Sequence, residues 1–138
     1  DLEATARLKE KSPLKIIADE NCLDSRNMPE IADAFHDINI KVMKCGGVRE
    51  GLKMVNMARE LELEIMLGCM IESSVAITAA THLSPLVDYA DLDGHILISN
   101  DPYLGTTVED GKLTLPDGPG LGVKLRERVA EPLEEAVA

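Results

Sequence analysis

Hydrophobic and polar residues alternate along the first 94 residues of this chain with two different periods. Short apolar runs, typical of strands buried on both faces, are separated by stretches in which apolar residues recur every three or four positions, as in helices. Strands are expected at residues 14–18, 39–44, 64–70 and 87–93, and a helix precedes each of them at 2–11, 27–36, 48–60 and 72–82. This α-β-α-β-α-β-α-β order predicts an α/β fold whose parallel strands are joined by right-handed crossovers.

The pattern changes after Gly94. Residues 95–100 and 106–115 alternate as antiparallel or edge strands do, and Asp110-Gly111 is typical of a hairpin turn. Residues 124–138 are charged and weakly helical, which indicates a peripheral tail. The expected organisation is an α/β unit at 1–94, a β-rich segment at 95–123 and a tail at 124–138.

The strand expected at 39–44 carries a lysine, Lys41, in the middle of its apolar residues. A lysine inside a buried strand is unfavourable unless its charge has a use. Taken alone, Lys41 is interpreted as a structural charge that reaches the sheet edge or meets a carboxylate. The alternative is a catalytic base, which requires that desolvation or a nearby cation lowers its pKa.

Composition and charge narrow the classes of function. Of the 138 residues, 45% are hydrophobic and only 2% are aromatic, so the core is expected to be aliphatic. The formal net charge of -11 argues against nucleic acid or an anionic membrane surface as a partner, because both require a basic face. The three cysteines show no CxxC spacing, which favours reduced thiols in a cytoplasmic protein over disulfides or a zinc site. No apolar run approaches the roughly 18 residues that a membrane span requires.

Polar side chains stand at the C-terminal end of every expected strand. They are Asp19 and Glu20, then Lys41 and Lys44, then Cys69 and Glu72, and finally Asp91 and Asp93. In parallel α/β sheets and barrels, ligands bind at this edge, and the four sets are expected to lie along it. Strand ends also face solvent, so the topology alone leaves a structural explanation equally open.

The carboxylates in this set favour a cationic ligand. Asp91 and Asp93 are two positions apart on an expected strand, so both side chains are predicted on one face. Like charges that close are unfavourable unless a metal ion or an ammonium group lies near them. Asp19 is suited to a hard cation, but Mg²⁺ or Ca²⁺ needs several oxygen ligands.

Five short motifs, taken in order, resemble the muconate-lactonising-enzyme subgroup of the enolase superfamily. Any one of them is weak, but their order is specific, and the Asp-x-Asp pair is typical of the dipeptide epimerases of that subgroup. The resemblance extends from about Leu2 to Val123. The motifs are Ile17-Ala18-Asp19-Glu20-Asn21, then Asn39-Ile40-Lys41-Val42-Met43-Lys44-Cys45-Gly46-Gly47, then Gly68-Cys69-Met70-Ile71-Glu72-Ser73, then Asp91-Leu92-Asp93, and Pro119-Gly120-Leu121-Gly122-Val123.

The resemblance implies a role for each matching residue. Lys41 matches the acid/base lysine on one side of the substrate α-carbon, and Lys44 has no implied catalytic role. The other implied roles are Mg²⁺ ligation by Asp19, support of the metal site by Glu20, binding of the dipeptide ammonium group by Asp91 and Asp93, and lining of the substrate pocket by Cys69 and Met70. The implied reaction is a 1,1-proton transfer between two lysines, through an enediolate that Mg²⁺ stabilises.

The resemblance also implies what this chain lacks. No expected strand ends in the Lys-x-Lys motif that supplies the opposite-face base, and two metal carboxylates are also missing, so we expect the C-terminal half of a (β/α)8-type barrel, inactive alone. The segment 95–123 is then the part that returns to a capping domain. Expected partners are a dipeptide substrate and either the N-terminal half of the enzyme or a second copy that pairs with the open sheet edges. Two alternatives remain: a non-catalytic, self-associating α/β module, and a relative of N-succinylamino acid racemase or o-succinylbenzoate synthase.

Overall fold

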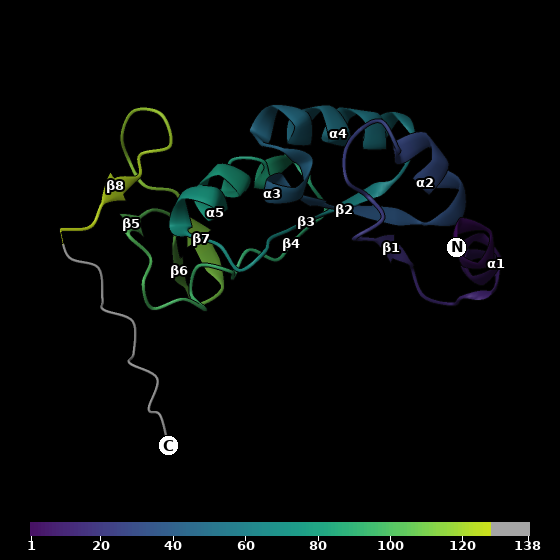
Figure 1. The fold of residues 1–138 in the computed structure, drawn as a ribbon, viewed down its shortest axis with the longest axis horizontal. Coiled ribbons are helices and arrows are strands. Elements are labelled where there is room, and N and C mark those ends of the chain that lie inside the picture. Colours follow the sequence, from purple (N-terminus) through teal and green to yellow (C-terminus); the bar gives the residue numbers. More distant parts are fainter. Residues whose placement is uncertain (128–138) are drawn as a thin grey trace, which may run out of the picture.

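A computed structural model describes residues 1–127 of the chain as an elongated molecule with a parallel sheet at one end and small antiparallel strands at the other (Figure 1). The first part comprises α1 (Leu2–Lys11), β1 (Ile17–Ala18), α2 (Met28–Ala34), β2 (Asp37–Lys41), α3 (Val42–Cys45), α4 (Val48–Glu60), β3 (Glu64–Gly68), α5 (Ser74–Thr81), the 3₁₀ turn η1 (Ser84–Leu86) and β4 (Tyr89–Ala90). The alternation of helix and strand predicted from the sequence is confirmed.

The sheet has the order β1-β2-β3-β4, and every neighbouring pair is parallel. Strands β2 and β3 form its centre, with Lys41 opposite Gly68 in the register. Because all four strands run in one direction, their C-terminal ends lie along one edge. The residues that follow the strands are therefore brought to that edge, as the sequence predicted.

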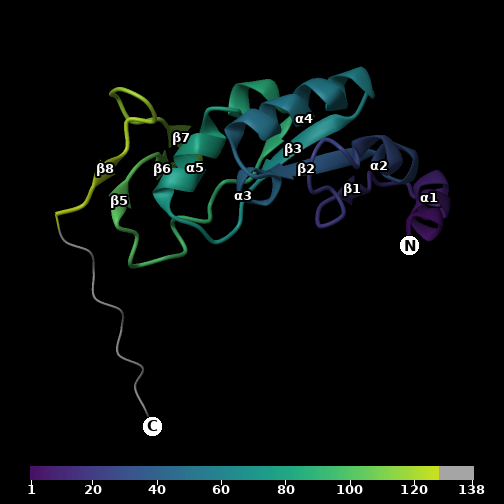
Figure 2. The ribbon, with the colours of Figure 1, turned by 45° about the horizontal axis from the view of Figure 1, so that its top comes forward.

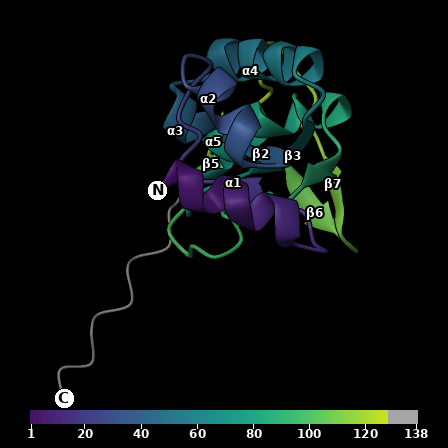
Figure 3. The ribbon, with the colours of Figure 1, turned by 90° about the vertical axis from the view of Figure 1, so that its right-hand side faces the viewer.

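Helices α2, α4 and α5 lie on one side of the sheet, and α1 packs against α2 at the β1 end (Figures 1 and 2). The end-on view in Figure 3 shows α4 above β2 and β3. The core between these layers is aliphatic, as expected, and Phe35 is its only aromatic residue among those described. Its largest fully buried apolar side chains are Met28, Ile31, Ile38, Ile40, Met54, Ile65, Leu67 and Ile77.

The strand predicted at 39–44 is wrong in its second half. Strand β2 ends at Lys41, and the helical turn α3 begins at the next residue. Val42 is buried whereas Met43 is 59% exposed, so this segment is not covered on both faces. Gly46, with φ of +88°, ends α3 in the left-handed conformation that glycine adopts most easily. Lys41 is therefore the last residue of its strand.

Three other predicted strands also differ from the structure. The strands expected at 14–18 and 87–93 shrink to the two-residue strands β1 and β4, so Asp91 and Asp93 lie beyond the end of β4. Residues 95–100 form turns and no strand. At residues 91–93 the alternation misled because Leu92 is buried between two exposed residues although the segment forms no strand.

The rest of the described chain forms two small antiparallel pairs. Strand β5 (Tyr103–Leu104) pairs with β8 (Lys124–Leu125), and β6 (Thr107–Glu109) pairs with β7 (Lys112–Thr114). The hairpin turn at Asp110-Gly111 joins β6 to β7, as predicted. The tail expected at 124–138 is wrong at its start, because Lys124 and Leu125 belong to a strand; residues 128–138 lie outside the described part.

Within residues 1–127, no helix is both long enough and apolar enough to cross a membrane. Cys22, Cys45 and Cys69 are all free thiols.

Candidate active site

Asp19 and Lys41 meet at the C-terminal edge of the sheet. Asp19 follows β1 and Lys41 ends β2, and because these strands are parallel neighbours their ends lie side by side. The Lys41 Nζ lies 2.9 Å from Asp19 Oδ2, and only 13% of the lysine side chain is exposed. The structural interpretation of Lys41 predicted that its ammonium group contacts a carboxylate, and this contact is present. That carboxylate is the one for which the resemblance implied Mg²⁺ ligation.

Lys44 is a second lysine on the same carboxylate. Its Nζ lies 2.8 Å from Asp19 Oδ1 and donates to the Asp19 backbone oxygen at 2.6 Å. Lys44 was predicted at the sheet edge, but the resemblance implied no catalytic role for it. In the helical turn α3, the spacing of three residues from Lys41 places both ammonium groups beside Asp19. Recognition of α3 would have revealed this pairing.

The two lysines lower the pKa of the Asp19 carboxyl. Burial by itself raises the pKa of the Asp19 carboxyl, but the hydrogen bonds and charges of Lys44 and Lys41 outweigh it, so the pKa lies below its usual value. Asn39 adds a neutral hydrogen bond, since its Nδ2 donates to Asp19 Oδ2 at 3.2 Å. Asn39 was not predicted as a site residue, although its position two residues before Lys41 on a strand indicates the same face.

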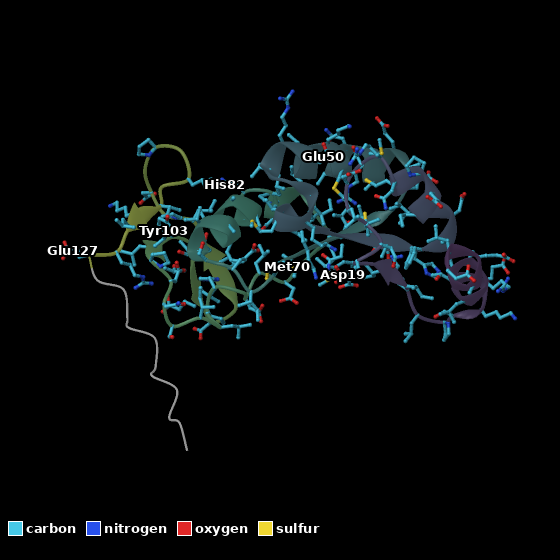
Figure 4. All side chains as sticks on the ribbon, viewed as in Figure 1. Asp19, Glu50, Met70, His82, Tyr103 and Glu127 are labelled. Carbon is cyan, nitrogen blue, oxygen red and sulfur yellow. The ribbon has the colours of Figure 1, made fainter. Side chains whose placement is uncertain are left out.

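Cys69, Met70 and Asp93 form a second group beyond β3. The Cys69 thiol contacts Asp93 Oδ1 at 3.8 Å, and Met70 is 48% exposed. Figure 4 shows Asp19 and Met70 on the side of the sheet opposite α4. Gly94 allows this arrangement, because a Cβ at that position would lie 2.0 Å from the Met70 backbone oxygen. The chain after β4 can therefore pass directly over the end of β3.

Asp91 and Asp93 are both exposed and flank the buried Leu92. Their predicted position on one face of a strand is wrong in detail, because β4 ends at Ala90, but the alternation about Leu92 leaves both side chains at the surface. A hydrogen bond from the Asp91 N–H to the Leu67 oxygen at 2.9 Å ties the segment to β3. The pair is available to a cationic group.

Glu72 lies between the two groups. Burial raises the pKa of its carboxyl, while a hydrogen bond from the Met70 N–H and the charge of Lys41 oppose that shift. Its Oε2 is buried and has no hydrogen-bond partner within residues 1–127. Glu72 was predicted at the strand end without a function.

The described residues fit a divalent cation only in part. Asp19 is a hard oxygen ligand, but no group of three or more His, Cys, Asp or Glu side chains in residues 1–127 is placed to hold a metal ion. Glu20, the predicted supporting residue, is exposed. A hollow of about 580 Å³ lies between α5 and residues 95–108 and contains none of the predicted site residues.

Residues 1–129 match the family model described as Enolase C-terminal domain-like, and the chain belongs to this family. Its four parallel strands are part of an enolase-superfamily C-terminal barrel domain, so the predicted fold class is confirmed.

Individual relatives are epimerases and racemases. The chain is 49% identical over 122 residues to L-Ala-D/L-Glu epimerase of Bacteroides thetaiotaomicron. The matched region is 88% of this chain and 32% of the relative. The chain also superimposes on dipeptide epimerase from Enterococcus faecalis, whose structure is complexed with Mg and the dipeptide L-Leu-L-Tyr. The TM-score is 0.81 at 35% sequence identity, and the superposition covers 89% of this chain and 37% of that one. N-succinyl Arg/Lys racemase from Bacillus cereus gives a TM-score of 0.85 at 31% identity, covering 92% and 36%. The chain thus spans about a third of the length of these relatives.

Proposed function

We propose that this chain supplies one side of the active site of a magnesium-dependent dipeptide epimerase, with activity only in the complete protein. The observation that carries the proposal is the contact of Lys41 with Asp19 at the ligand-binding edge of the sheet. The likeness to relatives named as dipeptide epimerases supports it.

In this proposal, Lys41 removes or returns the proton at one face of the substrate α-carbon. Asp19 provides one ligand for Mg²⁺, and Glu20 supports that ligand from the adjacent position. Asp91 and Asp93 bind the ammonium group of the dipeptide, while Cys69 and Met70 line the pocket between. Mg²⁺, when bound, supplies positive charge that stabilises the enediolate form of the substrate. The remaining metal ligands and the opposite-face base come from outside this chain.

The test uses the complete protein in deuterated water, with L-Ala-L-Glu and related dipeptides followed by proton NMR. We expect the unaltered protein to exchange the α-proton and to epimerise the dipeptide when Mg²⁺ is added. Lys41→Ala should lower epimerisation by a factor of about 10²–10⁴, the usual contribution of a positioned acid or base. Exchange should then persist for one epimer only, since the opposite base still reaches its own face. Epimerisation at an undiminished rate in Lys41→Ala would refute this role.

The N-succinylamino acid racemase alternative rests on the likeness to the Bacillus cereus racemase. The exposed Asp91 and Asp93 favour the dipeptide, because an N-succinyl substrate lacks a free ammonium group. In the complete protein, Asp91→Asn should lower turnover of dipeptides and leave any turnover of N-succinylamino acids unchanged. A loss confined to N-succinyl substrates would favour the racemase.

Chain 1–138 alone is expected to show no epimerisation, because the donor set around Asp19 is incomplete within residues 1–127. Measurable turnover by the chain alone would contradict this proposal.

Strands β1 and β4 end the parallel sheet on either side, and unpaired edges favour association with another chain. Light scattering of the isolated chain is therefore expected to show oligomers, whereas a monomer with full hydrogen-exchange protection would argue against open edges.

A further inference from the structure

Asn39 is a buried amide that points at the candidate metal ligand. It is 4% exposed in the centre of β2, on the same face as Lys41. Its Nδ2 donates to Asp19 Oδ2, which also receives Lys41. A carboxylate can only accept hydrogen bonds, so the amide nitrogen must face Asp19 and the amide oxygen is turned away.

The amide oxygen of Asn39 has no hydrogen-bond partner within residues 1–127. A buried acceptor without a partner is unfavourable, and an apolar side chain of similar size would avoid that cost. The amide is therefore explained by the bond that its nitrogen makes to Asp19, and packing alone does not explain it.

Gly68 on the neighbouring strand provides the space for this amide. A Cβ at Gly68 would lie 2.6 Å from Asn39 Oδ1 and 2.8 Å from Asn39 Nδ2, closer than a Cβ atom approaches its neighbours. Asn39 pairs with Met66 in the register, and its side chain leans two positions along β3 to lie over Gly68. The amide position thus depends on the absence of a side chain at position 68.

The neutral charge of Asn39 distinguishes it from the two lysines around Asp19. A divalent cation that binds Asp19 repels the ammonium groups of Lys41 and Lys44, but it does not repel an uncharged amide. The Asn39 bond is the one side-chain contact of Asp19 described here that can persist unchanged when a cation arrives.

We propose that Asn39 is a positioning residue that holds the Asp19 carboxylate in orientation for Mg²⁺, and that Gly68 is required to admit it. This inference rests on the proposed role of Asp19 as a metal ligand. Partners of this kind, which orient a metal ligand without touching the metal, typically change metal affinity by about 10–100-fold.

The test measures Mg²⁺ affinity of the complete protein by isothermal titration calorimetry, with thermal unfolding recorded in parallel. Asn39→Ala and Gly68→Ala should each weaken Mg²⁺ binding about 10-fold or more. The double variant should bind no more weakly than Asn39→Ala alone, because the new methyl group enters the space that the amide has vacated. Two independent losses that simply add would overturn the coupling between the two residues. Gly68→Ala also retains the amide, so it tests position even if Asn39→Ala unfolds.

Two control variants separate positioning from general damage. Gly51 lies in α4, and Gly51→Ala places a Cβ 2.9 Å from Leu83 Cδ1. This crowding is similar to that at Gly68 but makes no contact with Asp19. Thr81→Val removes a buried hydroxyl that donates to Ile77 at 2.8 Å. Both are expected to lower the unfolding temperature and to leave Mg²⁺ affinity unchanged; weakened affinity in these controls would overturn the specific role of Asn39.

Asp19→Asn is the reference that separates this inference from the proposed function. If Asp19→Asn abolishes Mg²⁺ binding while Asn39→Ala binds normally, the positioning role alone is wrong. If the unaltered complete protein shows no Mg²⁺-dependent epimerisation, the proposed function is wrong, and the role of Asn39 in it is withdrawn too.

Discussion

Replacement of Asp19 by asparagine tests how much the shared carboxylate stabilises the protein. Its contacts with Lys41 and Lys44, at 2.9 and 2.8 Å, are each worth about 6 kcal/mol of Coulomb energy at an effective dielectric constant of about 20. Dehydration of the three charges cancels most of that energy. Removing one partner of a fully buried pair costs about 3–5 kcal/mol, and because 33% of the Asp19 side chain is exposed, we expect about 2 kcal/mol.

The assay is urea unfolding of the complete protein in EDTA, so that no divalent metal contributes. Lys44→Met should cost less than Asp19→Asn, since Asp19 then retains Lys41. Asp33→Asn, which alters an exposed aspartate of α2, is the matched control and should be neutral. If Asp19→Asn is no more destabilising than this control, the paired charges do not stabilise the fold and the reasoning fails.

The same ion pairs predict a dependence on pH. Because the pKa of Asp19 is lower in the folded protein than in the unfolded chain, its contribution is complete above about pH 4 and is lost as the pH falls through the folded value. The difference in unfolding free energy between the unaltered protein and Asp19→Asn should therefore shrink below about pH 4. A difference that stays constant from neutral pH to about pH 3 would contradict the assigned cause.

Three further predictions concern other parts of the chain. Asp88 accepts hydrogen bonds from Arg59 at 2.7 Å and from the Ile65 N–H at 2.7 Å, so Asp88→Asn should lower the free energy of unfolding by about 1 kcal/mol in urea titrations; an unchanged midpoint would refute the contribution. Burial raises the pKa of the Cys22 thiol to about 11, so a thiol reagent at pH 8 should modify the partly exposed Cys69 first and Cys22 only on unfolding, and equal rates would show that Cys22 is accessible. Gly111 has a φ of +76° in the hairpin turn, so Gly111→Ala should lower the free energy of unfolding by about 1 kcal/mol in urea titrations. An unchanged free energy would mean that the turn relaxes.

The helices were predicted more accurately than the strands, for a physical reason. The helix predicted at 48–60 has the bounds of α4, because its apolar spacing, its start after Gly47 and its hydrogen bonds are all local. A strand exists only where a neighbour completes its ladder. Residues 91–93 keep the exposure alternation of a strand, yet β4 ends at Ala90 and only the Asp91 N–H still bonds to β3, a difference that the pattern alone did not reveal.

Two residues of the candidate site were predicted at the sheet edge, but the side-chain contacts of the site were not. Asp19 and Lys41 were assigned to one edge from strand order, and the structure places them in contact. The involvement of Lys44 and Asn39 was missed, because the first depends on a helical turn where a strand was expected and the second on space left by Gly68. The helical turn α3 is local, whereas the space beside Asn39 depends on the pairing of β2 with β3, which no single segment of sequence reveals.

By itself, the sequence determined the order of helices and strands, the aliphatic core and the ordered motifs through which the chain resembles the enolase superfamily. These properties depend on local periodicity and on the identities of nearby residues. The tertiary structure alone decided that two lysines and an asparagine share Asp19, although they are as many as 25 positions apart in the sequence. Such contacts depend on strand register, on where β2 ends, and on whether a neighbouring strand carries a side chain or leaves space.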